Sequence, residues 1–209
     1  MTKAKRILFI GDSITEWGRL EDPEQLGENY VRIIHDYLRV TYPESKFEII
    51  NKGIGGNRVT DLASRWQDDV IALSPDIVSI SIGINDVWRQ VDQPEMEQVY
   101  PDKFEQVYDG LLAQLKAETN ATIVLMEPTV IGEEIDSSGN EMLIPYVQAT
   151  HKLVEKYQTK LVPTHEVFLD YLKKNTNYNL TIDGVHMNSA GNMLMAKSWL
   201  QKNAALLDK

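Results

Sequence analysis

A serine near the beginning of the chain and an acid–imidazole pair near its end have the residue types needed for covalent catalysis. Ser13 lies in FIGDSITEWGR, three residues after an apolar run that ends at Ile10. A serine hydroxyl is a weak nucleophile and needs a base within hydrogen-bond reach, oriented by a third group. In TIDGVHMNSAG, Asp183 precedes His186 by three residues, a spacing that can set the carboxylate against Nδ1 and leave Nε2 free. We therefore predict a Ser13–His186–Asp183 triad.

The chain has three other histidines, which leave alternatives open. His35 and His151 lie within helical patterns, where a partly exposed helix residue is the simpler interpretation. His165 follows the last apolar run and is an alternative base. Asp-x-x-His is by itself a common pattern, and this turn could serve only to begin the final helix. His186 is favoured because its loop precedes the last helix of an α/β chain and can fold back over the sheet.

Ester hydrolysis also requires N–H donors that stabilise an oxyanion, each contributing roughly 3–4 kcal/mol. Three candidates follow apolar runs: the backbone N–H of Ser13, that of Gly56 in NKGIGGN, and the side-chain amide of Asn85 in GIND. Glycine lets a backbone N–H approach a ligand closely, although glycines after strands also form ordinary turns. Because all three donors lie at the ends of runs, we predict that Ser13, Gly56 and Asn85 form an oxyanion hole.

The elements that must position these residues alternate along the chain. Short apolar runs typical of buried parallel strands occur at residues 7–10, 47–50, 77–82, 123–126 and 161–162. Apolar residues at helical spacing occur within residues 31–38, 104–115, 147–157 and 193–207. This alternation predicts an α/β fold, a three-layer α/β/α sandwich around a five-stranded parallel sheet. Ligands of such sheets bind at the carboxyl ends of the strands, where the candidate residues lie.

Composition limits the organisation of the chain and its partners. The 209 residues, 43% hydrophobic and 25% charged, are interpreted as one domain over residues 1–209, because no linker or repeat divides them. A net charge of −10 with scattered basic residues argues against a nucleic-acid partner. The chain has no cysteine, which excludes disulfides and thiolate catalysis. The apolar run at residues 7–10 is shorter than a signal-peptide core, so we expect a cytoplasmic protein without a membrane partner.

The motifs occur in the order that defines the SGNH (GDSL) hydrolase family, and the chain resembles that family from residue 11 to residue 186. GDS, N-x-G-x-x-G, G-x-N-D and D-x-x-H resemble its four blocks. The resemblance implies a flavodoxin-like sandwich and serine esterase chemistry that needs no metal or cofactor. It implies Ser13 as nucleophile, His186 as base and Asp183 as its orienter, with Ser13, Gly56 and Asn85 in the oxyanion hole.

Residues 51–90 are similar to the corresponding stretch of bacterial intracellular acetylxylan esterases of that family, which remove acetyl groups from imported xylo-oligosaccharides. This likeness implies a small-molecule ester as substrate, an acetylated carbohydrate. The flanks of the last block differ, with Gly184 and Val185 between acid and base and Met187 following, and these flanks can shape the substrate pocket. The alternative is a lysophospholipase or thioesterase that acts on longer acyl chains.

Several residues beside the motifs are candidates for substrate contact: Asp12, Trp17, Arg58 and Trp88. The indole rings can stack on a sugar or simply pack beside the site, and Arg58, like Arg89, can bind hydroxyls or pair with acids. The polar, acidic segment 129–140 is long enough to be a flap, and we interpret it as a mobile loop. The sequence leaves a homo-oligomer open.

Two rival classes fit the same fold. A flavodoxin-like binding domain would need a phosphate-cradling loop, but GDSITEWG has one glycine before Gly18, and Walker A and G-x-G-x-x-G patterns are absent. A catalytically dead carbohydrate-binding relative is disfavoured because every expected catalytic residue is present. The sequence therefore predicts an esterase that works through an acyl-enzyme.

Overall fold

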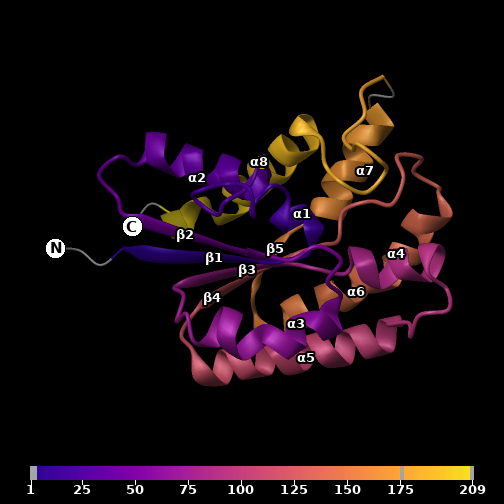
Figure 1. Cartoon of the computed structure of the whole chain (residues 1–209), viewed down its shortest axis with the longest axis horizontal. Coiled ribbons are helices and arrows are strands. Elements are labelled where there is room, and N and C mark those ends of the chain that lie inside the picture. The colour runs from indigo at the N-terminus through magenta and orange to yellow at the C-terminus, as the bar shows by residue number, and fades with distance from the viewer. Residues whose placement is uncertain (1–3, 175–176, 208–209) are drawn as a thin grey trace.

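Five parallel strands form the central sheet of the computed structural model, which describes residues 4–174 and 177–207 (Figure 1). The strands are β1 (Lys5–Gly11), β2 (Phe47–Gly53), β3 (Ile77–Ser81), β4 (Thr122–Met126) and β5 (Lys160–Val162). Their order across the sheet is β2-β1-β3-β4-β5, as in flavodoxin-like folds. The predicted five-stranded parallel sheet is confirmed, and four of its strands extend beyond the apolar runs because backbone pairing continues through polar residues.

Helices cover both faces of this sheet and complete the predicted sandwich. They are α1 (Ser13–Glu16), α2 (Tyr30–Thr41), α3 (Val59–Trp66), α4 (Ile84–Asp92), α5 (Pro101–Glu118), α6 (Ser138–Tyr157), α7 (Thr164–Lys174) and α8 (Ser189–Leu207), and α3 continues as the π-helix η1 (Gln67–Ile71). In Figure 1, α2 and α8 lie above the sheet, and α3, α5 and α6 lie below it. The four helical patterns of the sequence correspond to α2, α5, α6 and α8, and no such pattern predicted α1, α3, α4 and α7.

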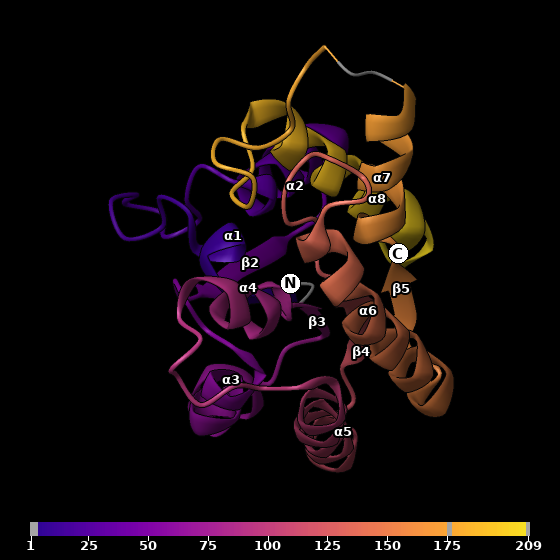
Figure 2. The same cartoon turned by 90° about the vertical axis from the view of Figure 1, so that its right-hand side faces the viewer.

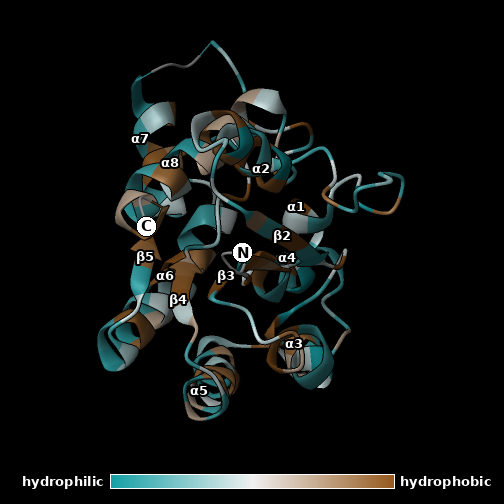
Figure 3. Ribbon diagram, turned by 90° about the vertical axis from the view of Figure 1, so that its left-hand side faces the viewer, coloured by the Kyte–Doolittle hydropathy of each residue, from teal (hydrophilic) through white to brown (hydrophobic). Residues whose placement is uncertain are grey.

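The core lies on both sides of β1, whose Phe9 is fully buried. The Phe9 ring packs against Trp199 of α8 and Tyr30 of α2, with ring centroids 5.2 Å and 5.9 Å away. Trp199 satisfies its indole N–H by donating to Ser79 Oγ of β3 at 2.9 Å. Figure 3 shows hydrophobic colour along β4 and alternating colours along the surrounding helices, as burial of one helix face requires. The sheet thus gives the loops at its carboxyl ends a rigid base.

No helix within residues 4–174 and 177–207 combines the length and the apolar character needed to cross a membrane.

Candidate active site

Ser13 lies where β1 ends and α1 begins. Asp12 caps α1, because its carboxylate accepts the Ile14 N–H at 3.0 Å. The backbones around this junction are so close that only glycine fits at two positions. A Cβ on Gly11 would lie 2.3 Å from the Ser81 carbonyl oxygen, and one on Gly53 would lie 2.3 Å from the backbone nitrogen of Glu16. The tight junction presents the serine at the carboxyl edge of the sheet.

The structure brings Ser13 together with the acid–imidazole pair, 173 residues further along the chain. His186 Nε2 lies 2.9 Å from Ser13 Oγ, and His186 Nδ1 lies 2.7 Å from Asp183 Oδ2. The other carboxylate oxygen of Asp183 accepts the backbone N–H groups of Val185 at 3.0 Å and His186 at 2.8 Å. Figure 2 shows the loop before α8 lying over α1. The three groups form a continuous hydrogen-bonded chain.

Asp183 is held in its ionised form. Partial burial acts to raise the pKa of Asp183, but hydrogen bonds from the His186 ring and from the backbone N–H groups of His186 and Val185 outweigh it and lower that pKa. An ionised carboxylate accepts a hydrogen bond from Nδ1–H and so fixes the tautomer in which Nε2 carries a lone pair. His186 can therefore accept the hydroxyl proton of Ser13.

The oxyanion-hole candidates come from three neighbouring strand ends. Ser13 is the first residue of α1, so its N–H is among those that no helical partner satisfies. Gly56 adopts a φ of 78°, which favours glycine, and a Cβ there would meet Arg89 Nη2 at 3.5 Å. The buried Asn85 amide donates one hydrogen bond to the Asn57 carbonyl at 3.1 Å. Its second N–H can point elsewhere, because an amide nitrogen has two donors.

The two predicted aromatic contacts occupy different positions. The Trp17 ring lies 4.8 Å from the His186 ring, with the ring planes tilted by 36°, and Trp17 is 37% exposed. Trp17 therefore covers one side of the imidazole while keeping a surface open to solvent. Trp88 of α4 is only partly buried and packs against the hydrophobic core. Arg58 is the N-cap residue of α3, and its guanidinium donates to the Glu97 carbonyl at 2.7 Å, which links it to the loop after α4.

Two buried carboxyl groups lie behind the site, one next to Ser13 and one next to Asn85 in the sequence. Burial raises the pKa of Asp12 to about 7, against the lowering effect of the Ile14 N–H and of His186. Burial raises the pKa of Asp86 to about 8, although the Val59 N–H opposes the rise. Asp12 is 1% exposed and caps α1, so the structure does not support the predicted substrate contact of this residue.

The other three histidines have partners elsewhere. His35 Nδ1 lies 2.8 Å from Asp36, and His151 contacts the buried Glu127. His165 is buried on α7, where its Nδ1 donates to the carbonyl oxygen of Thr129. The structure therefore gives the alternative base a hydrogen bond that fixes a loop, and it brings His186 to the serine.

Segment 129–140 is irregular, as predicted, only as far as Ser137. Its last three residues form the start of α6, and the Ser137 hydroxyl donates to the Ile131 carbonyl at 2.7 Å. The Ile131 N–H donates to Asn140 Oδ1 at 2.9 Å, and the Gly132 N–H donates to the Gly184 carbonyl at 2.8 Å. These bonds fix the segment to α6 and to the loop that carries His186.

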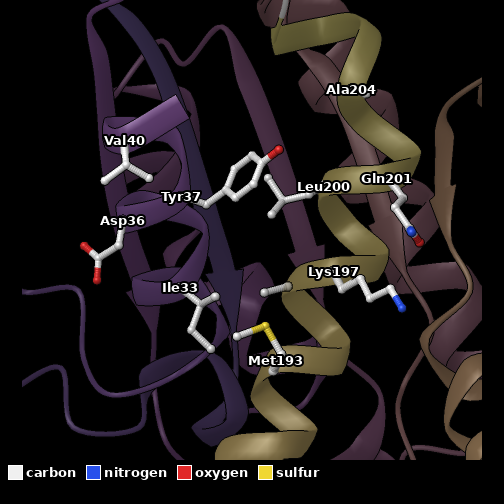
Figure 4. Close-up of a pocket in the computed structure, with 10 residues that line it drawn as sticks. Ile33, Asp36, Tyr37, Val40, Met193, Lys197, Leu200, Gln201 and Ala204 are labelled. Atoms are coloured by element: carbon white, nitrogen blue, oxygen red, sulfur yellow. The ribbon is translucent and has the colours of Figure 1, made fainter. Parts of the chain in front are cut away.

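A separate hollow of about 690 Å³ lies between α2 and α8 and does not include the triad (Figure 4). Apolar side chains such as Tyr37, Val40, Met193 and Leu200 line it, while Asp36 and Lys197 point away on its two sides. The chemistry lies at Ser13, so this hollow is not the active site. Among the residues that the structure describes, no group of three or more acids and histidines could hold a metal ion.

Known proteins are similar to this chain over nearly its whole length. The model of the GDSL-like Lipase/Acylhydrolase family matches residues 9–194. An acetylxylan esterase from Geobacillus stearothermophilus is 39% identical over 95% of this chain and 93% of its own length. A crystal structure of an acetylxylan esterase from that organism has a TM-score of 0.88 at 38% identity, covering 95% of this chain and 93% of its own. Its variants with a serine, an aspartate or a histidine replaced by alanine are described as catalytic mutants. An alpha/beta hydrolase enzyme from the metagenome of Lake Arreo has a TM-score of 0.90 at 32% identity, with 98% of each chain covered.

Proposed function

The chain belongs to the GDSL-like lipase/acylhydrolase family of ester hydrolases, and from that premise we propose that it removes acetyl groups from xylo-oligosaccharides. The observation that supports serine esterase chemistry is the hydrogen-bonded chain from Ser13 Oγ through His186 to Asp183. The acetylxylan esterase that is 39% identical over most of both chains supports the substrate class. Its catalytic mutants replace a serine, an aspartate and a histidine, the same residue types that meet here.

The geometry supports a two-step mechanism. Ser13 Oγ attacks the acetyl carbonyl carbon while His186 Nε2 removes the hydroxyl proton, and the carbonyl oxygen becomes an oxyanion. The N–H groups of Ser13 and Gly56 and the amide of Asn85 donate to that oxygen. The protonated His186 then gives its proton to the departing sugar oxygen, which leaves an acetyl group on Ser13.

In the second step water is the nucleophile and Ser13 Oγ is the leaving group. His186 Nε2 removes a proton from a water molecule, whose oxygen attacks the acetyl-Ser13 carbonyl. Collapse of the second oxyanion returns the proton to Ser13 Oγ and releases acetate. Asp183 remains ionised throughout and stabilises the imidazolium through Nδ1, which fits the lowered pKa of that carboxylate.

The test is a rate panel with purified protein. We expect acetylated xylo-oligosaccharides and p-nitrophenyl acetate to be hydrolysed faster than esters with longer acyl chains. Ser13→Ala should lower kcat by about 10³-fold or more, because the nucleophile is lost. Ser138→Ala, at an exposed serine of α6, is the matched control and should keep the wild-type rate.

Two results would contradict the proposal. Turnover of Ser13→Ala at the rate of the Ser138→Ala control would exclude Ser13 as the nucleophile. A clear preference for long acyl chains would instead favour the lysophospholipase or thioesterase interpretation.

The cytoplasmic location and a homo-oligomeric state belong to the same proposal and stay predictions. Fractionation of the source cells tests the first, and light scattering of the purified protein tests the second.

A further inference from the structure

The loop that carries Asp183 and His186 lies outside the regular elements. An isolated antiparallel bridge between Thr181 and Met187 closes it, with the Ile182 N–H donating to the His186 carbonyl at 2.8 Å. These bonds shape the loop, and the buried side chains of Val185 and Met187 pack it against the hydrophobic core. The distance between His186 and Ser13 therefore depends on contacts that the loop makes with other segments.

One carboxylate from a distant segment gathers three donors at the base of this loop. Glu133 Oε1 accepts the backbone N–H groups of Leu180 at 2.8 Å and Thr181 at 2.7 Å, and it also accepts the Thr181 hydroxyl. The neighbouring Gly132 N–H donates to the Gly184 carbonyl at 2.8 Å. Glu133 thus holds the start of the loop, and Gly132 holds the stretch between Asp183 and His186. Figure 2 shows the two segments side by side.

The segment that supplies Glu133 is itself fixed to α6. Asn140 accepts the Ile131 N–H at 2.9 Å and donates to the Glu134 carbonyl at 2.8 Å. Gly139 packs so closely that a Cβ there would lie 2.3 Å from Ile131 Cγ2. A buried helix turn therefore supports Glu133, and its carboxylate provides a defined anchor for the loop.

We propose that Glu133 is a positioning residue, whose carboxylate holds the Asp183–His186 loop where His186 Nε2 reaches Ser13. This inference rests on the proposed function. Hydrogen bonds to an ionised carboxylate are about twice as strong as neutral ones. Asp183 and His186 belong to one loop and move together, whereas the contact between His186 and Ser13 joins two separate segments. Loss of the anchor therefore affects the serine–histidine distance and spares the acid–histidine contact.

Replacement of the carboxylate gives a specific kinetic signature. Glu133→Ala should lower kcat by about 10- to 100-fold, because small misplacements of a catalytic group reduce the rate this strongly. KM should stay at its wild-type value, and the acidic limb of the kcat profile should keep its position because the Asp183–His186 contact persists. Glu133→Gln should recover part of kcat, since its amide oxygen has two lone pairs and can still accept two of the three hydrogen bonds.

Glu134→Ala is the matched control. Glu134 is the next residue, is exposed and contributes its backbone carbonyl to Asn140, a contact that this change keeps. Glu134→Ala removes a negative charge from the same segment as Glu133→Ala does, and it should leave kcat unchanged. A wild-type kcat in a folded Glu133→Ala protein, or equal losses in Glu133→Ala and Glu134→Ala, would overturn the positioning role.

A reagent that phosphonylates active serines separates this inference from the proposed function. Absence of both turnover and Ser13 labelling in the wild-type protein would refute the proposed function. Normal wild-type labelling with slow labelling of Glu133→Ala supports the anchor, and equally fast labelling of both refutes it. If Glu133→Ala does not fold, Thr181→Val removes one of the three donors: a several-fold lower labelling rate then supports the anchor, and the wild-type rate refutes it.

Discussion

The two halves of the catalytic pair are held in different ways. Ser13 lies at the end of β1, and buried asparagine side chains join the segments around it. Asn51 Nδ2 donates to the carbonyls of Thr15 at 2.6 Å and Leu26 at 2.8 Å, and Asn29 Nδ2 donates to Thr15 at 2.8 Å. His186 lies on an irregular loop that contacts the Glu133 carboxylate and the Gly132 N–H of another segment. The nucleophile thus follows directly from a strand of the sheet, whereas the base lies on a loop held by hydrogen bonds and by its two buried neighbours, Val185 and Met187.

Because of this difference, we expect substitutions in the two regions to affect different quantities, the free energy of unfolding near Ser13 and kcat in the His186 loop. Changes around Ser13 remove buried hydrogen bonds or close contacts, and their cost falls on the free energy of unfolding. Changes at exposed residues of the His186 loop, such as Asp183, remove no buried side chain, and their cost falls on kcat. Asp183 in the loop and Asn51 near the nucleophile allow this separation to be tested.

The largest effect is expected in the loop. Asp183→Asn should lower kcat by about 10⁴-fold, because the amide nitrogen facing Nδ1 would favour the wrong imidazole tautomer. The free energy of unfolding should change little, since Asp183 lies on an irregular loop and its amide oxygen can still accept the two backbone N–H groups. Steady-state kinetics and urea denaturation measure the two quantities. Asp136→Asn, at an exposed aspartate, is the control, and equal kcat values in both variants would contradict the role of Asp183.

An intermediate effect is expected near the nucleophile. Asn51→Ala removes hydrogen bonds to Thr15, Leu26 and the Gly53 N–H, and the last is 2.8 Å long. The Thr15 and Leu26 carbonyls keep Asn29 Nδ2 as a donor, but the Gly53 N–H loses its acceptor. The loss of these bonds should lower the free energy of unfolding by about 2 kcal/mol. Urea denaturation measures it against Asn120→Ala, an exposed asparagine whose loss should cost less than about 0.5 kcal/mol. An Asn51→Ala protein as stable as that control would remove the proposed difference between the two halves.

The smallest effect concerns the buried acids and depends on pH. Because the folded-state pKa of Asp86 is raised to about 8, the folded protein retains a proton that the unfolded chain loses at lower pH. The contribution of Asp86 is therefore complete below its unfolded pKa and decreases as pH rises toward about 8, by roughly 1 kcal/mol between pH 6 and 7. Asp86→Asn should remove this decrease, so its stability relative to the wild type should rise with pH.

Urea denaturation at several pH values measures this difference. Asp68→Asn, at an exposed aspartate of η1, should keep the pH dependence of the wild type. A pH dependence shared by Asp86→Asn and Asp68→Asn would show that Asp86 is not responsible.

The sequence predicted the strands and the meeting of Ser13 with His186, because apolar runs and ordered motifs determine both. It did not predict the support of the loop. Glu133 lies in a polar stretch that is typical of solvated loops, and its partners are backbone N–H groups 47 and 48 residues away, which leave no mark in the side-chain pattern. Asp12 shows the same limit, since its position beside Ser13 does not reveal that its carboxylate turns inward to cap α1.

The two carboxyl groups behind the site also affect the charge that a reacting ester meets. Formal counting assigns them full negative charges within the net charge of −10. With pKa values of about 7 and about 8, Asp12 retains its proton in part at neutral pH, and Asp86 retains it for the most part. At neutral pH the Asp86 carboxyl, next to Asn85 in the sequence, is therefore mostly uncharged, whereas Asp12 carries part of a negative charge. In more alkaline solution both groups become anionic, so the charge buried behind Ser13 and Asn85 depends on pH.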